Sequence, residues 1–165
     1  MTSAKRDKTP NAEGLFLRAE QYEEDGDLKN AFKHLLAAAQ LGHAMSQVSL
    51  GNFYASGRGV RKDLDKAADW YKRAYRNGYR DGALNLAIDK RKEGDLRSAV
   101  IWFKKAIEMN SGDACLELAK IYAARKGGRN SAAGLLSRAL RMSRDDISTD
   151  TKKTAESLLK AMAKM

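Results

Sequence analysis

The sequence predicts an all-α fold, an α-solenoid of about four helix-turn-helix repeats followed by a C-terminal capping helix. Three observations lead to this prediction. One helical frame of small and large residues occurs four times at nearly constant spacing, an aspartate precedes three of these four helices, and a separate amphipathic segment follows the last one. Recurrence of a helical frame at about 30–40 residues is typical of stacked helix pairs.

The recurring frame is a small–large–small triplet at positions i, i+4 and i+7, which lie on one face of a helix. The four triplets are Ala31–Leu35–Ala38, Ala67–Tyr71–Ala74, Ala99–Phe103–Ala106 and Ala132–Leu136–Ala139. Their first alanines are 36, 32 and 33 residues apart. Alanine lets two helices approach closely while the large middle residue fills the space between them.

The ends of these helices also carry recurring residues. Asp27, Asp63 and Asp95 precede the first three, where a carboxylate can accept hydrogen bonds from unpaired backbone N–H groups. Glycines follow the same helices, and we expect them to form left-handed C-terminal caps; they are Gly42, Gly78 and Gly112.

A first helix precedes each of these second helices, and the first helices share a small residue that also permits close packing. The aligned residues are Ala19, Gly51, Ala87 and Ala119. The repeats are therefore predicted over residues 12–147, after a flexible N-terminal tail of residues 1–11. Residues 148–165 are predicted to form the capping helix, begun by Ser148 or Thr149, which covers the open apolar face of the last repeat.

Composition and charge limit the possible environments of the chain. It is 43% hydrophobic and 32% charged, with one cysteine and no apolar stretch long enough to span a bilayer. Residues 1–10 do not resemble a secretory signal, so we expect a cytoplasmic protein with no membrane partner. The net charge of +10 is concentrated in residues 43–165 and favours acidic partners.

The segment from Leu50 to Gly78 resembles the Sel-one-like repeat, a relative of the tetratricopeptide repeat. The resemblance rests on Leu50-Gly51, Tyr54, Gly57-x-Gly59-Val60, Asp63, Lys66-Ala67, Trp70-Tyr71 and Lys72-x-Ala74. The other repeats are less similar, because short turns such as Gly26-Asp27 and Gly94-Asp95 replace the glycine-containing loop. The resemblance implies right-handed stacking of helix pairs and a concave surface that binds a peptide or a protein, as in scaffolds and adaptors.

No arrangement of residues in the sequence predicts catalysis, a metal site or a cofactor. His34 and His43 have neither zinc-ligand nor triad spacing, and Cys115 lies on an apolar helix face. We therefore expect a protein that is not an enzyme, with structural histidines and a buried cysteine.

The predicted function is to bind an acidic segment of another protein in the concave groove that the first helices line. The candidate groove residues are Glu20, Asn52, Asn85, Arg91 and Lys120. An asparagine amide can bond a peptide backbone in both directions, and Arg91 and Lys120 would pair with carboxylates.

Two alternatives remain open from the sequence. Basic residues recur along the chain and could follow a phosphate backbone, which would indicate nucleic-acid binding, although the aromatic residues belong to the packing frame. The protein could also be an immunity protein that blocks a toxin or an enzyme. An adaptor and an immunity protein both bind protein tightly, so the sequence does not separate them.

Overall fold

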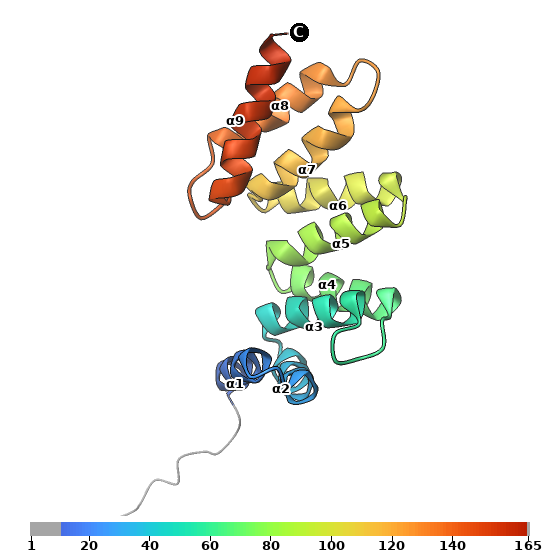
Figure 1. Ribbon diagram of the computed structural model, residues 1–165, viewed down its shortest axis with the longest axis vertical. Coiled ribbons are helices and arrows are strands. Elements are labelled where there is room, and N and C mark those ends of the chain that lie inside the picture. The colour runs from blue at the N-terminus through green and yellow to red at the C-terminus, as the bar shows by residue number, and fades with distance from the viewer. Residues whose placement is uncertain (1–10, 165) are drawn as a thin grey trace, which may run out of the picture. The chain divides into compact units, whose positions relative to one another are not determined.

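The computed structural model describes residues 11–164, and within this range the chain forms nine α-helices and no strand. The chain divides into two compact units, the first ending at Asn77 and the second beginning at Gly78. Figure 1 colours the helices by residue number. The predicted all-α fold of paired helices is confirmed. The predicted tail lies almost entirely outside the described residues, apart from Asn11, whose side chain caps the first helix.

The first unit contains two helix pairs, and each of its four helices is 13 residues long. The helices are α1 (Ala12–Glu24), α2 (Leu28–Gln40), α3 (Ala44–Ser56) and α4 (Leu64–Arg76). The helices pack in chain order, with α1 against α2, α2 against α3 and α3 against α4.

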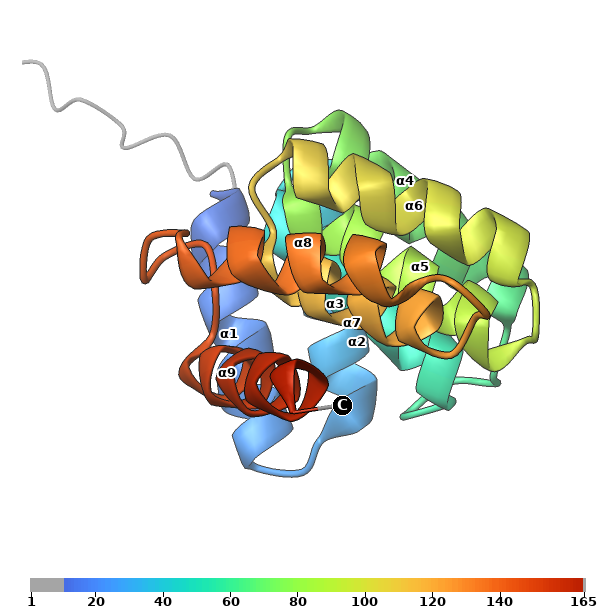
Figure 2. The ribbon, with the colours of Figure 1, turned by 90° about the horizontal axis from the view of Figure 1, so that it is seen from above.

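The second unit contains two further pairs and a final helix. The helices are α5 (Arg80–Lys92), α6 (Leu96–Glu108), α7 (Gly112–Ala123), α8 (Arg129–Leu140) and α9 (Thr149–Ala163). Consecutive helices again pack together, and α9 turns back along α8 and also contacts α7 (Figure 2).

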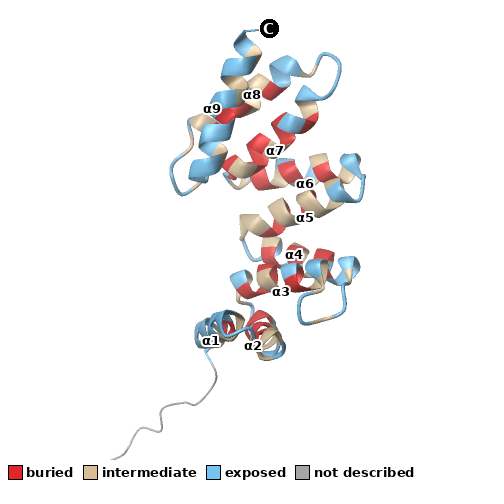
Figure 3. Cartoon of the chain, viewed as in Figure 1, coloured by how far each residue is buried: buried red, intermediate tan, exposed pale blue. Residues whose placement is uncertain are grey.

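The small–large–small frame forms the inner face of each second helix. All twelve of its residues are at most 2% exposed, and the buried stripes are visible along the helices in Figure 3. The small residues of the first helices are buried as well. The repeat frame read from the sequence therefore identifies the contact between the two helices of each pair.

A close approach occurs between α3 and α4, where Gly51 faces the ring of Tyr71. A Cβ atom at Gly51 would lie 2.5 Å from Cδ1 of Tyr71 and closer still to Cε1. The other three repeats have alanine at this position and leucine or phenylalanine at the Tyr71 position. Glycine is thus required here because tyrosine is the bulkiest of the second-helix residues.

The predicted aspartate caps are confirmed. Asp27, Asp63 and Asp95 precede α2, α4 and α6, and each carboxylate accepts a hydrogen bond from a backbone N–H three residues later. Hydrogen bonds from Asn30, Lys66 and Ser98 lower the pKa of these carboxyls. The last helix is capped in the same way, by the Ser148 hydroxyl.

The prediction for the glycines is correct at two positions and wrong at the third. Gly42 and Gly78 have φ values of 90° and 80°, in the left-handed region. After α6, Asn110 takes that conformation with φ 61°, and Gly112 is instead the first residue of α7. Gly112 lacks a side chain for a different reason, because its Cβ would lie 2.6 Å from Cβ of Ile147.

The α8–α9 connection fastens α9 to the rest of the second unit. Arg80, at the start of α5, donates from Nη1 to Oδ1 of Asp146 at 2.6 Å and from Nη2 to the carbonyl of Asp145. The N–H of Gly112 donates to the Asp146 carbonyl at 2.6 Å, and Ile147 is buried. Ala155 on α9 is fully buried in the cluster that includes Leu116 and Leu136.

Gly51→Ala is expected to destabilise the protein by about 1–2 kcal/mol, because overpacking against Tyr71 outweighs the better helix propensity of alanine. Thermal unfolding followed by circular dichroism measures this effect. Gly134→Ala is the matched control, since Gly134 lies within α8 with open space around it, and this change should stabilise slightly. Adding Tyr71→Leu should rescue Gly51→Ala; equal melting of all variants would refute the close contact.

Arg80→Met is expected to lower the melting temperature at pH 7, because Asp146 loses its ion pair. The Ser143 hydroxyl and Arg80 hold the pKa of Asp146 below its usual range. Its contribution is therefore complete above the unfolded pKa and disappears as the pH falls through the folded pKa. The difference between variant and parent should narrow below about pH 4. Lys104→Met, which removes an exposed charge from α6, should leave the melting temperature nearly unchanged; a pH-independent loss in Arg80→Met would contradict this account.

Candidate functional site

The five candidate binding residues lie on first helices of both units. Glu20 is on α1 and Asn52 on α3, in the first unit, whereas Asn85 and Arg91 are on α5 and Lys120 is on α7, in the second. Glu20, Asn52 and Lys120 occupy the same repeat position, one residue after the small residue of their helix. All three are exposed.

In the first unit, Asn52 is connected to the core of its own repeat. Its Oδ1 atom accepts a hydrogen bond of 2.8 Å from the Tyr71 hydroxyl, whose ring is buried between α3 and α4. The amide is therefore held in place at the surface, while Glu20 is exposed on α1. A preorganised amide loses less side-chain entropy when it binds a ligand.

In the second unit, Arg91 and Lys120 converge on a residue that the sequence analysis missed, Glu117 on α7. Arg91 donates from Nη1 to Oε2 of Glu117, and Lys120 donates from Nζ to Oε1 at 2.7 Å. The Glu117 side chain is 17% exposed, against 33% for Arg91 and 44% for Lys120. We call these three residues the Glu117 cluster; it links neighbouring repeats and carries a net charge of +1.

Asn85 lies on a different side of α5 from Arg91. It precedes Arg91 by six residues, which places the two about 120° apart around the axis of α5. In the repeat frame Asn85 occupies the position of Glu117, two residues before the small residue. Applying the frame consistently would have identified Glu117 as a surface residue of α7, and its i,i+3 spacing from Lys120 indicates an ion pair on one helix face.

The surface formed by α5 and α7 is polarised along the helices. Asp81 and Asp113 lie in their first turns, whereas Arg91 and Lys120 lie in their last turns. Burial raises the pKa of Asp81, and the neighbouring Asp113 contributes in the same direction while Arg80 opposes it. This distribution complements the helix dipoles, which favour negative charge at the N-terminal end of a helix and positive charge at its C-terminal end.

Three cations of the second helices contact groups of their own units. The Arg73 guanidinium lies 4.5 Å from the Trp70 ring centroid and the Lys105 amine 4.1 Å from that of Trp102. Arg138 donates to the carbonyl of Ile107 at 3.1 Å. Both tryptophans are half-buried and a cation lies over each ring, which leaves less open aromatic face for stacking with bases.

The histidines and the cysteine that were considered for catalysis or metal binding form local hydrogen bonds or lie in the core. His34 contacts the Asn30 carbonyl through Nδ1 at 2.9 Å, and His43 contacts the Ser46 hydroxyl at 2.8 Å. Cys115 is fully buried, and burial raises the pKa of its thiol. Within residues 11–164, no three histidine, cysteine or carboxylate side chains are grouped so as to hold a metal ion.

No helix in the described part of the chain is long and apolar enough to cross a membrane.

Comparison with known proteins agrees with this architecture. The Sel1 repeat matches at residues 15–43, 44–79 and 83–111, which together make up more than half of the chain. The α7–α8 pair lies beyond the matched segments. No curated protein matches the sequence significantly.

Solved structures share the fold at low sequence identity. A Sel1 repeat protein from Oxalobacter formigenes is 23% identical with a TM-score of 0.70, covering 84% of this chain and 61% of that one. For c5321, a protective antigen of uropathogenic Escherichia coli, the identity is 17%, the TM-score 0.74 and the coverage 92% and 33%. MamA is 20% identical with a TM-score of 0.61 and coverage of 89% and 81%.

The chain thus spans 61% and 33% of the lengths of the first two proteins. Sel1 repeats generally mediate protein–protein interactions and typically act as non-catalytic scaffolds. Three matched repeats, the paired helices and the fold shared with these structures lead to one conclusion. The chain belongs to the Sel1 repeat family.

Proposed function

We propose that this protein is a cytoplasmic, non-catalytic interaction module that binds an acidic segment of another protein. The second unit binds the segment at the Glu117 cluster. In this proposal residues 12–147 act as four repeats and residues 148–165 cap the last one. Glu20, Asn52 and Asn85 are proposed as further contacts, each on its own unit.

The observation that carries the proposal is the convergence of two cations from neighbouring repeats on one carboxylate. Arg91 reaches Glu117 from α5, while Lys120 reaches it from the next turn of α7. This arrangement is complementary to a carboxylate, and a guanidinium with a neighbouring ammonium is a common recognition pair for that group. Glu117 therefore marks a position where a partner's carboxylate would be stabilised.

Binding would proceed by exchange of carboxylates. Arg91 and Lys120 are about a third and almost half exposed, so both remain accessible to a partner while paired with Glu117. The Glu117 side chain is only 17% exposed, so its displacement leaves a mostly buried carboxylate unpaired, and the new pairs with the partner have to offset that cost. Contact with a partner excludes water and strengthens the new pairs.

Arg91→Ala with Lys120→Ala is expected to weaken capture of the partner about tenfold or more. The reason is that an ion pair shielded from water by the partner contributes more to the binding free energy than a charge at the solvent-exposed edge of the contact. Glu117→Gln should strengthen capture of the partner. Glutamine keeps the shape of Glu117 but has no charge, so it competes less with the partner's carboxylate for Arg91 and Lys120. The variants serve as baits for affinity purification with quantitative mass spectrometry, at low and near-physiological salt.

The matched control is Lys72→Ala with Arg76→Ala on α4, which removes the same charge from a second helix. It should leave capture nearly unchanged. Equal losses of affinity in both double variants, together with an affinity that falls steeply as the salt concentration rises, would indicate binding to the phosphate backbone of a nucleic acid instead. Weaker capture by Glu117→Gln would show that the cluster only holds the repeats together.

A further inference from the structure

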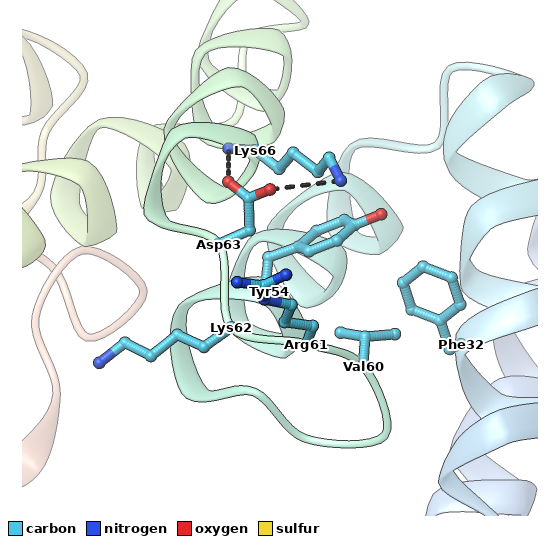
Figure 4. A pocket seen from close by; sticks show the side chains of 7 residues that line it. All are labelled: Phe32, Tyr54, Val60, Arg61, Lys62, Asp63 and Lys66. Carbon is cyan, nitrogen blue, oxygen red and sulfur yellow. Dashed lines mark hydrogen bonds and ion pairs between the residues drawn. The ribbon is translucent and has the colours of Figure 1, made fainter.

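The first unit contains a hollow of about 550 Å³ that lies apart from the candidate binding residues. Its lining comes from α2, from the end of α3, and from the loop and first turn that lead into α4 (Figure 4). The lining residues are Phe32, Tyr54, Val60, Arg61, Lys62, Asp63 and Lys66. This volume falls within the range of about 300–1,000 Å³ that is usual for ligand pockets.

The loop that closes the hollow is fixed to the preceding repeat. Gly59 packs so closely on the start of α2 that a Cβ would lie 2.8 Å from Cβ of Leu28 and 2.9 Å from its carbonyl oxygen. Arg58 pairs with Glu23 at 3.2 Å, and Val60 packs against the core formed by α1, α2 and α3. The hollow is therefore formed before any ligand binds, which reduces the entropy lost on binding.

The inner walls of the hollow are apolar. The rings of Phe32 and Tyr54 meet edge to face, with centroids 5.6 Å apart and an interplanar angle of 87°. Figure 4 shows Val60 facing Phe32. These side chains could enclose an apolar group and remove it from water.

The rim of the hollow is cationic. The one lining carboxylate, Asp63, accepts from the Lys66 backbone at 3.0 Å and pairs with the Lys66 amine at 3.2 Å. Arg61 and Lys62 are exposed, and no carboxylate of residues 11–164 forms an ion pair with either. Two positive charges therefore lie on the loop beside the hollow, where they would attract an anionic ligand, although the Lys62 amine itself points away from Phe32 and Val60 (Figure 4).

We propose that this hollow binds a partner protein's segment in which apolar side chains are flanked by carboxylates. The apolar side chains pack onto Phe32, Tyr54 and Val60, and the carboxylates pair with Arg61 and Lys62 of the loop. This site is independent of the Glu117 cluster, which lies in the other unit.

The ring arrangement favours a peptide over a nucleic acid. The Lys66 amine lies 5.4 Å from the Tyr54 ring centroid, and the Phe32 ring is also 6.3 Å from that of Phe53. Neighbouring side chains thus occupy space around both rings, whereas base stacking needs an open aromatic face. An apolar side chain needs only a cavity of suitable size.

The test is a titration of the full-length, ¹⁵N-labelled protein followed by NMR. The probes are acetyl-Glu-Glu-Leu-Phe-Glu-Glu-amide, a version with Gln for every Glu, and a version with Ala for Leu and Phe. The first peptide should shift the amide signals of Val60, Arg61 and Lys66 and saturate. Both altered peptides should bind about tenfold more weakly, because each lacks one of the two recognition elements.

Arg61→Glu with Lys62→Glu should weaken the first peptide about tenfold or more, since attraction to the loop becomes repulsion. The matched control, Lys72→Glu with Arg76→Glu, reverses the same charge on α4 and should bind like the parent. Circular dichroism should show that both variants melt as the parent does. Arg91→Ala with Lys120→Ala should not alter this titration, so the two sites can fail separately.

Several results would overturn the proposal: no saturable shift at the hollow, shifts confined to α5 and α7, equal binding of all three peptides, or equal losses in the two charge-reversed variants. Tighter binding of hexathymidylate than of the acidic peptide at the same signals would assign the hollow to nucleic acid.

Discussion

The structure depends on how closely the two helices of each repeat approach one another. Every pair has a small residue on its first helix and a large residue between two alanines on its second, and all of them are buried. Because the interior is tightly packed, the two positions must change together. The Gly51–Tyr71 contact shows this most clearly, since the larger ring is accommodated only by removal of a Cβ.

This contact also determines which residues reach the surface. Burying one residue of a first helix turns the next one outward, and Glu20, Asn52 and Lys120 all occupy that position. Tyr71 connects the two roles, because its ring fills the core while its hydroxyl holds the amide of Asn52. A single side chain, Tyr71, thus contributes both to the packing of the core and to the orientation of a polar group at the surface.

The sequence was sufficient to predict what depends on local periodicity. Burial of the alanine frame and capping by Asp27, Asp63 and Asp95 follow from spacing along one helix. Gly112 was misassigned because glycine at a helix boundary has more than one use, and here contact with Ile147 decides it. The Arg91–Glu117 pair and the hollow were missed because they depend on neighbours that come from different helices, such as Arg91 or Leu28. Periodicity carries no information about such pairs.

The attachment of Asp146 to Arg80 changes how the second unit can come apart. A linear array of repeats normally frays from its ends, because each element contacts only its neighbours. Here residues 66 positions apart in the chain are joined, so that the loop before α9 is bonded to the start of α5. Loosening the last helix therefore disturbs the first helix of the same unit. Such a long-range closure makes local opening more costly and the unit more cooperative.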